Sequence, residues 1–422
     1  MNRISLKLII LALGITLLTA GPLFAWGESN PRAMAMGGAY TALSLGNEAS
    51  AHNPANLGLS INRPFTLDIV SVGLAVKNNS FSLADYNKYT GQFLDDDDKE
   101  AILDKIPAEG LKLDVITEAG SMSFSTGHFG LSVRALGASK LSLDKDPFEL
   151  LLYGNAVKSE VNLSDTKGEA YAIGDAAFSY GRPLMSWSGG EMAVGASFHY
   201  LRGIAYEKIV RAEGGIATTP DGFVGDGEML VKSALGGQGL AFDLGVSIRF
   251  EKDWFFSGCW QNIYSQINWN RDTEEMLLTF DTVEPLNLDN MSNDDSDSLI
   301  ETNDTTYDVG SFSSKLPTVF KLGLARNYKK FTWAIDWEQG TAPGASQAVT
   351  PRIGTGLEYR LADFFPLRVG TAFGGDKGTI VSTGFGVYMG PLHVDMAVAN
   401  NGSFNPAATK GINFAFALGL KF

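Results

Sequence analysis

The chain has 422 residues, of which 19% are charged and 11% aromatic, and this composition excludes a disordered or coiled-coil protein. Its 47 acidic residues outnumber its 33 basic ones, for a net charge of −14, and no basic stretch is interleaved with aromatic residues. Nucleic acid is therefore not an expected partner. The mean hydropathy of +0.01 is the intermediate value typical of strands with one apolar and one polar face.

The reactive side chains show no catalytic or metal-binding pattern. Cys259 is the single cysteine, so an internal disulfide is impossible, and between Gly258 and Trp260 it has the surroundings of an inert buried thiol. Residues 186–189 lack the Gly-x-Ser-x-Gly elbow of hydrolases. The sequence thus predicts neither an enzyme nor a cofactor or metal site. The four histidines are scattered, at His52, His128, His199 and His393.

Residues 1–25 have the pattern of a cleaved secretory signal peptide. Arg3 and Lys7 precede an apolar run from Leu8 to Leu18, and small residues lead up to Ala25. The apolar run is too short to span a bilayer, which takes ~20 residues. We therefore expect an exported protein that is periplasmic, secreted, or a barrel in an outer membrane.

Alternation of apolar and polar residues distinguishes these possibilities. Between residues 240 and 250 the even positions are large and apolar, and the odd positions are small or charged; 331–338, 392–399 and 412–422 alternate in the same way. A soluble sandwich also alternates. These segments, however, run for roughly 10 to 15 residues, beyond the ~5–6 usual in globular sheets and close to the ~9–11 that cross a bilayer. The pattern predicts a transmembrane antiparallel β-barrel.

The strand count follows from the same pattern. Fifteen periodic segments occur, and because bacterial single-chain barrels use even numbers of strands, we predict about fourteen, with 228–235 the weakest segment. Short connections such as 328–330 and 389–391 are expected to be periplasmic turns. The predicted segments are 64–76, 113–126, 128–143, 167–181, 190–209, 228–235, 238–250, 254–269, 317–328, 330–340, 351–362, 366–374, 379–389, 391–400 and 411–422.

Two long inserts, 85–110 and 271–314, are expected on the extracellular side. Acidic residues from Asp95 to Glu100 precede an apolar run and predict a short helix over 95–106; a calcium site is the alternative. Residues 271–310 hold twelve acids and one base, Arg271, and predict an extended, solvated loop. Their spacing does not follow a Ca²⁺-binding loop.

Residues 26–63 differ from the rest, since they do not alternate and are rich in small residues. Irregular backbone is tolerated inside a membrane barrel where protein surrounds it. We therefore predict that 26–63 form a plug, or hatch, inside the lumen of a barrel built from residues 64–422.

The hatch also carries a family resemblance. The run GGAYTAL from Gly37, followed by NEASAHNPANLGL, resembles the amino-terminal hatch of FadL-type outer membrane proteins, whose Asn-Pro-Ala motif matches Asn53, Pro54 and Ala55. Later segments such as GLAFDLGVSIRF and PLRVGTAFGG resemble a FadL-like subgroup that includes the PorV-type secretion shuttles. The resemblance covers nearly the whole mature chain and implies a 14-stranded barrel with a hatch. The hatch or gating residues that it implies are Gly37, Gly38, Asn53, Pro54, Ala55 and Asn56.

Charged residues within the predicted strands should face the lumen. An ionised base facing lipid near the midplane costs ~2–4 kcal/mol, so these side chains should point inward and pair. Arg32 on the hatch is expected to pair with one of the inward carboxylates as a latch, and solvated lumen charge is the alternative. The inward set is Asp243, Arg249, Asp336, Glu338, Arg368, His393 and Asp395.

Two functions are compatible with this sequence. The resemblance implies an outer membrane channel for passive uptake of hydrophobic, fatty-acid-like molecules, which pass sideways into the bilayer when the hatch moves. The alternative is a PorV-like barrel that transports nothing and docks secreted proteins, or a structural barrel. An apolar cavity beyond the hatch would favour the channel, whereas a filled lumen with a polar outer platform would favour docking. Phe422 resembles the carboxy-terminal signal read by the barrel-assembly machinery, an expected partner together with outer membrane lipid.

Overall fold

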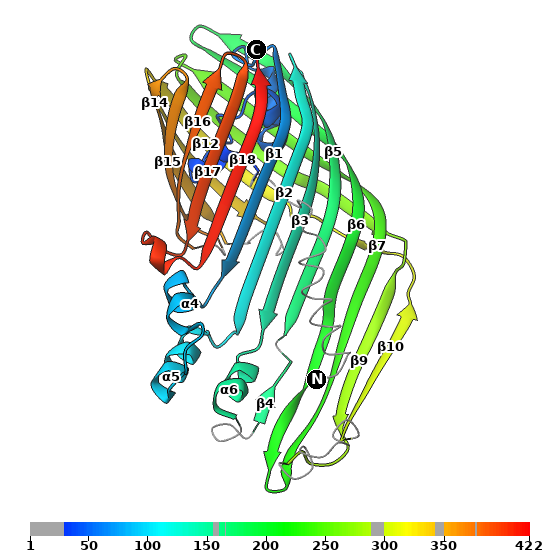
Figure 1. The fold of residues 1–422 in the computed structure, drawn as a ribbon. Coiled ribbons are helices and arrows are strands. Elements are labelled where there is room, and N and C mark those ends of the chain that lie inside the picture. The colour runs from blue at the N-terminus through cyan, green and yellow to red at the C-terminus, as the bar shows by residue number, and fades with distance from the viewer. Residues whose placement is uncertain (1–28, 155–159, 165, 288–298, 342–349, 376–377) are drawn as a thin grey trace.

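The chain folds into a closed antiparallel barrel of fourteen strands around an amino-terminal plug (Figure 1). The computed structural model describes residues 29–154, 160–164, 166–287, 299–341, 350–375 and 378–422. Strand β1 pairs with β2 on one side and with β18 on the other, which closes the barrel and leaves no edge. The predicted fold class is confirmed. The barrel strands are β1 (Phe65–Asn78), β2 (Leu111–Thr126), β3 (Phe129–Leu143), β5 (Lys167–Trp187), β6 (Gly190–Thr219), β7 (Gly222–Phe250), β8 (Trp254–Trp269), β12 (Val319–Tyr328), β13 (Phe331–Gly340), β14 (Arg352–Ala362), β15 (Phe365–Gly374), β16 (Ile380–Met389), β17 (Leu392–Asn401) and β18 (Gly411–Lys421).

The apolar parity of each strand faces outward. In β7, Leu240, Phe242 and Leu244 are 38%, 38% and 49% exposed, whereas Ala241 and Asp243 between them are buried. The outer surface is therefore apolar, and the lumen holds the small and polar side chains. This is the arrangement of a barrel that faces lipid. No helix in the described part of the chain is long and apolar enough to cross a membrane.

The count of fourteen is correct because two predicted segments are one strand. Residues 228–235 and 238–250 both belong to β7, and the pattern breaks at Gly236 and Gly237 without ending the strand. Gly236 has a φ of +88°, so the backbone adopts a conformation there that other residues rarely reach while the ladder to β6 continues beyond it.

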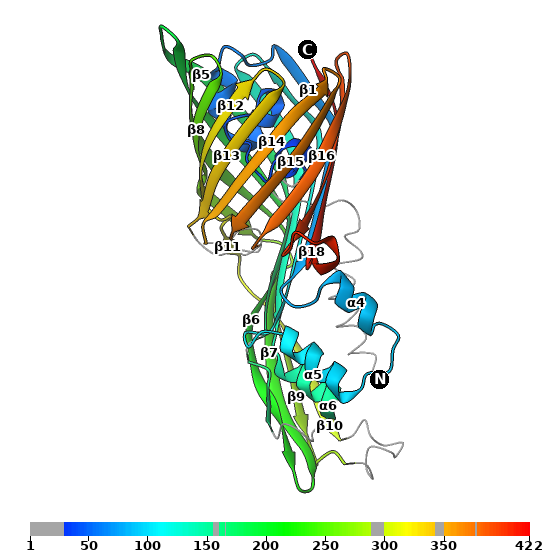
Figure 2. The ribbon, with the colours of Figure 1, turned by 90° about the vertical axis from the view of Figure 1, so that its left-hand side faces the viewer.

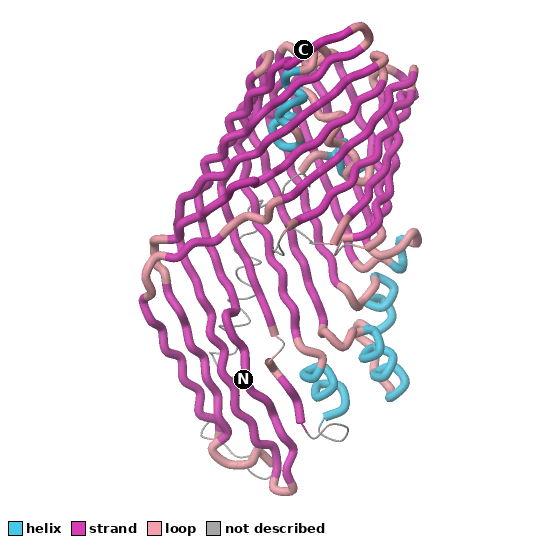
Figure 3. The backbone as a smooth tube through the Cα atoms, turned by 180° about the vertical axis from the view of Figure 1, so that it is seen from behind, coloured by secondary structure: helices cyan, strands magenta, loops and turns pink. Residues whose placement is uncertain are grey.

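The two ends of the barrel differ. At the short-turn end, connections of two or three residues join the strands, among them 329–330 and 390–391. At the opposite, long-loop end, strands β5, β6 and β7 continue past the barrel as a sheet (Figure 2). Helices lie beside this sheet, and a hairpin widens it, as seen from behind in Figure 3. These added elements are α4 (Leu83–Tyr89), α5 (Asp96–Lys105), α6 (Asp146–Tyr153), β4 (Glu160–Asn162), β9 (Glu274–Thr282), β10 (Ile300–Asp308) and β11 (Phe312–Ser314).

The two inserts have more structure than the sequence pattern indicates. The helix predicted at 95–106 is α5, and Asp95 caps it by accepting a hydrogen bond from the Asp98 backbone N–H. The loop predicted at 271–310 contains the β9–β10 hairpin instead, because β9 pairs with the extended part of β7. Its acidic residues misled the prediction, since charge on an exposed strand is compatible with pairing.

The plug lies inside the barrel, nearer the short-turn end. From residue 29 it runs through α2 (Pro31–Ala35), η1 (Gly46–Glu48), α3 (Ala49–His52) and η2 (Pro54–Gly58), and most of its residues are buried. Many of its backbone N–H groups donate to carbonyl oxygens within the plug, as Asn53 N does to Ala49 O at 2.9 Å. The predicted signal peptide, 1–25, lies outside the described residues.

Candidate functional site: the hatch and the lumen

The hatch touches the barrel wall first at β14, β15 and β16. Gly37 has a φ of +67° and lies so close to the wall that a Cβ atom there would overlap the Thr371 carbonyl group and come within 2.9 Å of Thr355 O. Ser382 Oγ accepts a hydrogen bond from Gly37 N and donates one to Ala35 O, both at 3.1 Å. Only glycine satisfies both the backbone angle and the space at this contact.

Gly38, the next predicted hatch residue, is also in the left-handed region, with a φ of +84°. A Cβ atom there would approach the Arg352 guanidinium at 2.8 Å, and Arg352 Nη2 donates to Gly37 O at 3.0 Å. Gly354 and Gly356 on β14 supply the other half of the contact, because they leave room for the backbone of residues 36 and 37. The wall and the hatch are thus fitted to each other by glycines on both sides.

A second contact lies across the lumen, at β5 to β8. Asn53 Nδ2 donates to Val246 O and Ser247 Oγ, both at 3.1 Å, and Asn53 Oδ1 accepts from Ala55 N at 3.0 Å. Pro54 begins η2, and three wall glycines leave room for it and for Asn53. Added Cβ atoms on Gly181 and Gly195 would overlap the Pro54 backbone, and one on Gly245 would overlap Asn53 Oδ1.

Asn56 links the halves of the hatch to this wall. Its Nδ2 donates to Thr41 O at 2.9 Å and Ser44 O at 2.8 Å, and its Oδ1 accepts a hydrogen bond from Ser247 Oγ. Ala55 beside it is fully buried. The predicted hatch residues therefore all lie where the hatch contacts the wall or itself. The glycines allow close approach of backbones there, and the amide groups of Asn53 and Asn56 form hydrogen bonds.

Asp336, on β13, holds the middle of the hatch. One carboxylate oxygen, Oδ2, accepts the backbone N–H of Tyr40 at 3.0 Å and that of Thr41 at 2.8 Å. Hydrogen bonds to a carboxylate are stronger than neutral ones. This carboxylate, which the sequence placed in the lumen, thus acts as a bracket for the hatch rather than as part of an ion pair with Arg32.

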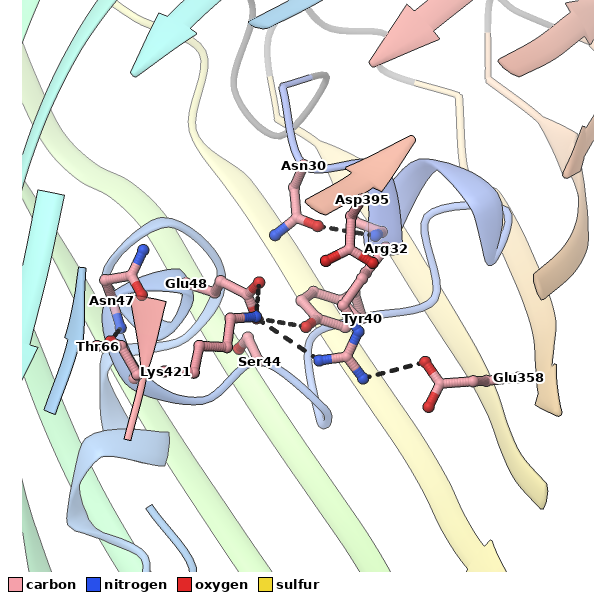
Figure 4. Close-up of polar contacts among 12 residues, drawn as sticks. Asn30, Arg32, Tyr40, Ser44, Asn47, Glu48, Thr66, Glu358, Asp395 and Lys421 are labelled. Carbon is pink, nitrogen blue, oxygen red and sulfur yellow. Dashed lines mark hydrogen bonds and ion pairs between the residues drawn. The ribbon is translucent and has the colours of Figure 1, made fainter. Parts of the chain in front are cut away.

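The ion pair of Arg32 differs from the prediction. Arg32 Nη2 lies 3.2 Å from Glu358 Oε2 on β14, and none of the described ion pairs joins Arg32 to a predicted carboxylate (Figure 4). Glu358 also contacts Arg368 Nε at 2.7 Å, and Arg368 Nη1 lies 2.6 Å from Asp395 Oδ1. The predicted Asp395 is therefore connected to the hatch through Arg368 and Glu358. The error arose because alternation places a side chain in the lumen but does not say which strand lies opposite the hatch at Arg32.

A second ion pair ties the hatch to the last strand. Lys421 Nζ on β18 lies 2.9 Å from Glu48 Oε1, and the Tyr40 hydroxyl donates to Glu48 Oε2 at 2.5 Å (Figure 4). Burial opposes ionisation of Glu48, but the positive charges of Lys421 and Arg32 outweigh it and lower the pKa of Glu48 to about 2. The carboxylate is therefore ionised in the docked hatch at neutral pH.

His52 is a buried neutral group in the same region. Burial, with the positive charges of Lys321 and Arg134, lowers the pKa of His52 to about 3. His52 lines a polar cavity of about 40 Å³ between the hatch and β1 to β3, and the edge of its ring faces Tyr40 at 5.1 Å. A cavity of this size holds a few water molecules at most.

Beyond the hatch, toward the long-loop end, a belt of charged side chains crosses five neighbouring strands. Arg134 Nη2 lies 2.7 Å from Asp175 Oδ2, and Glu118 Oε1 lies 3.7 Å from Arg134 Nη1. His199 Nδ1 lies 2.9 Å from Asp175 Oδ1, and its Nε2 lies 3.2 Å from Asp243 Oδ2. We call these residues, Glu118, Arg134, Asp175, His199 and Asp243, the charged belt. Sequence reasoning found only Asp243 as a lumen charge, although charges in mid-strand at the inward parity were a usable signal for the others.

An apolar layer follows the belt. Each of the five belt strands contributes one inward apolar residue to this layer, and that residue lies two positions from the belt residue of the same strand, toward the long-loop end. Aromatic residues from β6, β8 and β11 complete the layer. Trp269 is fully buried, and its ring lies 5.3 Å from that of Tyr206, which in turn lies 5.4 Å from Phe312. We call this set the outer apolar cluster; it includes Ile116, Leu136, Ile173, Leu201, Ala241, Ile267, Trp269 and Leu316.

The remaining predicted residues lie elsewhere in the lumen. Arg249 is near the short-turn end, 3.3 Å from Glu191, and Glu338 lies 3.4 Å from Lys321. His393 is stacked on Tyr388 at 3.9 Å. Cys259 is buried, as expected. Among the described residues, no group of three or more His, Cys, Asp or Glu side chains could hold a metal ion.

Phe422 lies just after β18, with its side chain 58% exposed. Its backbone N–H donates to Phe65 O at 3.0 Å, and the two phenyl rings are 5.9 Å apart. The terminal residue is therefore held in the barrel seam and also presented on its surface.

Comparison with known proteins identifies the fold. A family model described as a family of unknown function, DUF5723, matches residues 58–229 and 211–400. The toluene transporter TbuX of Ralstonia pickettii superposes with a TM-score of 0.53 at 14% identity, over 94% of this chain and 99% of that one. The monoaromatic hydrocarbon channel CymD gives a TM-score of 0.54 at 12% identity, with the same coverage. The fold is that of FadL-like barrels. No match was found among curated protein sequences.

Proposed function

This chain belongs to the DUF5723 family, and we propose that it is an outer membrane channel that takes up hydrophobic small molecules and releases them sideways into the bilayer. In this proposal the chain is exported with a cleaved signal peptide, the short-turn end faces the periplasm, and the long-loop end faces outward. No step of the proposal involves an enzyme activity or a cofactor.

The observation that carries the proposal is the division of the lumen into two parts. The outer apolar cluster lines β1 to β8 on the long-loop side, and its side chains are buried against one another, so in this proposal they separate to hold an apolar molecule. Below it, the charged belt and the docked hatch oppose further axial movement, because an apolar molecule cannot replace their hydrogen bonds. Such a molecule can therefore enter from outside but has no favourable path along the barrel axis.

A seam in the wall supports a sideways route at the same height. Strand β12 pairs with β8 only as far as Val319 and Gln261, and β11 pairs with β8 from Ile267 onward. Between these ladders, residues 262–266 of β8 face 315–318, and side-chain contacts such as Ser265 Oγ to Leu316 N and O, both at 2.9 Å, join them. Fewer backbone hydrogen bonds make this seam easier to part than a complete ladder.

The ligand class agrees with the names of two structural neighbours, a toluene transporter and a monoaromatic hydrocarbon channel. The test is native mass spectrometry of the protein extracted gently from its own outer membrane. We expect a small apolar molecule to remain bound, and to be lost when Leu201 in the outer apolar cluster is replaced by Asp. Recovery of an empty barrel that also fails to bind added hydrocarbons would refute the proposal.

A disulfide across the seam tests the sideways route separately. In a Cys259→Ala background, Ser265→Cys with Leu316→Cys should stop transfer of a fluorescent apolar probe into proteoliposomes, and a reductant should restore it. The matched control is Val387→Cys with Val394→Cys, which are directly opposite each other where β16 and β17 are continuously paired. Transfer that is insensitive to the first disulfide would argue against this exit.

Docking of a secreted protein is the second candidate, favoured by the sheet beyond the barrel. Every residue of β10 is exposed, and among the described strands β10 pairs only with β9, so one edge of this acidic hairpin is open. An open edge can accept an extended segment of another protein. In the same mass spectrometry experiment, a protein partner bound to a barrel without a small molecule would support docking over transport.

A further inference from the structure

The sheet beyond the barrel ends in an open edge at β10 (Figure 1). This strand pairs with β9 in an unbroken register from Ile300 to Asp308, and all of its residues are exposed. Edge strands are usually protected by a bulge, a proline or a lysine, and β10 has none of these. Its charges are all negative, so they repel an acidic strand but not a basic one.

The register of the hairpin shows which backbone groups of β10 face the open edge. Val283 N donates to Leu299 O, and Val309 N donates to Thr273 O, both at 2.9 Å. In an antiparallel pair every second residue bonds to the partner strand, so the odd-numbered residues of β10 face β9. The even-numbered residues therefore direct their N–H and C=O groups to the open edge. They are Ile300, Thr302, Asp304, Thr306 and Asp308.

The β9–β10 hairpin is strongly acidic. Each of its strands carries three carboxylates and neither carries a basic residue. Among the described ion pairs only one of these acids has a partner, Glu275, whose Oε1 lies 2.8 Å from Lys232 Nζ. Three acids lie in one row across the sheet, because Asp281 is directly opposite both Asp226 on β7 and Glu301 on β10. A basic side chain placed next to Glu301 at the edge would continue this row with the opposite charge, which is a favourable cross-strand pair.

From this edge we infer that the long-loop end binds an extended, basic segment of another protein, which adds to β10 as an antiparallel strand. The inference deepens the docking candidate above by naming its partner, and it does not depend on transport through the barrel. The even-numbered residues of β10 supply the backbone hydrogen bonds, and its acids select the sequence. In a partner segment of nine residues, the first, fifth and eighth lie opposite Asp308, Asp304 and Glu301, so Lys or Arg is expected there. A second copy of this chain is not the occupant, because joining two β10 edges would oppose like charges.

Synthetic peptides test the inference on the full chain in detergent. The probe is a fluorescently labelled peptide of nine residues, with Lys at the first, fifth and eighth positions and Val or Thr elsewhere. Fluorescence anisotropy should show saturable binding, and hydrogen–deuterium exchange of residues 300–308 should slow when the peptide is present. The same peptide with Glu at the three Lys positions should bind at least about tenfold more weakly.

Methylation of the peptide backbone separates strand addition from attraction between charges. Methyl groups on the amides of the third and seventh residues, which lie opposite Thr306 and Thr302, block hydrogen bonds to β10 and should weaken binding at least about tenfold. The matched control carries its methyl groups on the fourth and sixth residues, whose amides face away from β10, and should bind like the unmethylated peptide. On the protein, Thr306→Pro removes an N–H group of the open edge and should weaken binding to a similar extent. Thr306→Val keeps that N–H group and should bind the peptide normally.

The outcomes separate this inference from the proposed functions. Equal binding of the two methylated peptides would overturn it, because the attraction would then be electrostatic only. A dimer of the chain that Thr306→Pro dissociates would also overturn it, since a second copy would then occupy the edge. If no peptide binds, the inference fails, whereas the channel and docking at another surface are still tested by mass spectrometry. The peptide comparison needs no protein variant, so it does not depend on whether Thr306→Pro keeps the hairpin folded.

Discussion

The hatch should be released by replacing Asn53 with Ala, because this side chain makes the amide contacts to β7. Two of its hydrogen bonds, to Val246 O and Ser247 Oγ at 3.1 Å, join the hatch to the wall. A hydrogen bond contributes a net of roughly 0.5–1.5 kcal/mol, so the two wall contacts together are worth about 1–3 kcal/mol. We therefore expect Asn53→Ala to raise the population of undocked hatch by about 5- to 150-fold.

The chain contains a matched control for this variant. The Asn-Pro-Ala motif occurs again at Asn405, where the side chain accepts the Ala407 N–H at 3.1 Å and caps η5 (Pro406–Ala408), as Asn53 caps η2. Asn405 is exposed in the loop between β17 and β18 and makes no contact with the hatch in any described interaction. Asn405→Ala removes the same capping bond, so the difference between the two variants isolates the contacts to the wall.

Two measurements report the release. Hydrogen–deuterium exchange of residues 49–58 should accelerate in Asn53→Ala, and brief openings should appear in planar-bilayer recordings, while the barrel keeps its resistance to heating in detergent. Asn405→Ala should match the unmodified protein in both measurements. If the two variants exchange at the same rate, the hatch is not held by the Asn53 contacts, and the gating role of this motif is refuted.

Three further results are expected. Acidification should loosen the hatch. The pKa of His52 is lowered to about 3 in the docked state, so docking is most favourable above pH 6.5, and about 3 kcal/mol of the docking free energy is lost by pH 4.5. The contribution of Glu48 to docking is lost only between pH 4.5 and about 2. Exchange measured against pH should show the first step, and His52→Gln should abolish it. Glu358→Gln should lower the free energy of unfolding in denaturant titrations by about 3 kcal/mol, since it removes the carboxylate charge that the buried Arg368 and the half-buried Arg32 share. Glu301→Gln on exposed β10 should have no effect. Deleting Phe422 should reduce the fraction of protein inserted in the outer membrane, and normal insertion would contradict an assembly role.

Much of the fold could be predicted from alternation alone. A strand that faces lipid on one side and the lumen on the other must alternate, so the boundaries of strands such as β13 and β17 follow to within two residues. The helix α5 was equally predictable, because its acidic cap is a local signal. The β9–β10 hairpin was not, since its partner on β7 lies far away in the sequence and its own residues resemble a solvated loop.

Contacts between the hatch and the wall could be predicted only in part. Asp336 was placed in the lumen correctly, but its role in accepting the Tyr40 and Thr41 N–H groups depends on where the hatch backbone lies. The partner of Arg32 was predicted wrongly, because a pairing between distant elements depends on strand register, which parity does not give. Glycines such as Gly354 carried the missing information, since an inward glycine marks a place where another backbone comes close.

The repeated Asn-Pro-Ala motif shows why location decides function here. At Asn405 it caps a short helix in water, and at Asn53 the same local structure is fitted against Gly195 and Gly245 of the wall. The Nδ2 group of the amide then becomes a docking group, because its hydrogen-bond acceptors among the described residues are wall atoms of β7 and β8. In the proposed channel, a hatch fitted this closely closes the axis of the barrel, so that a molecule held at the outer apolar cluster would leave through the β8 seam.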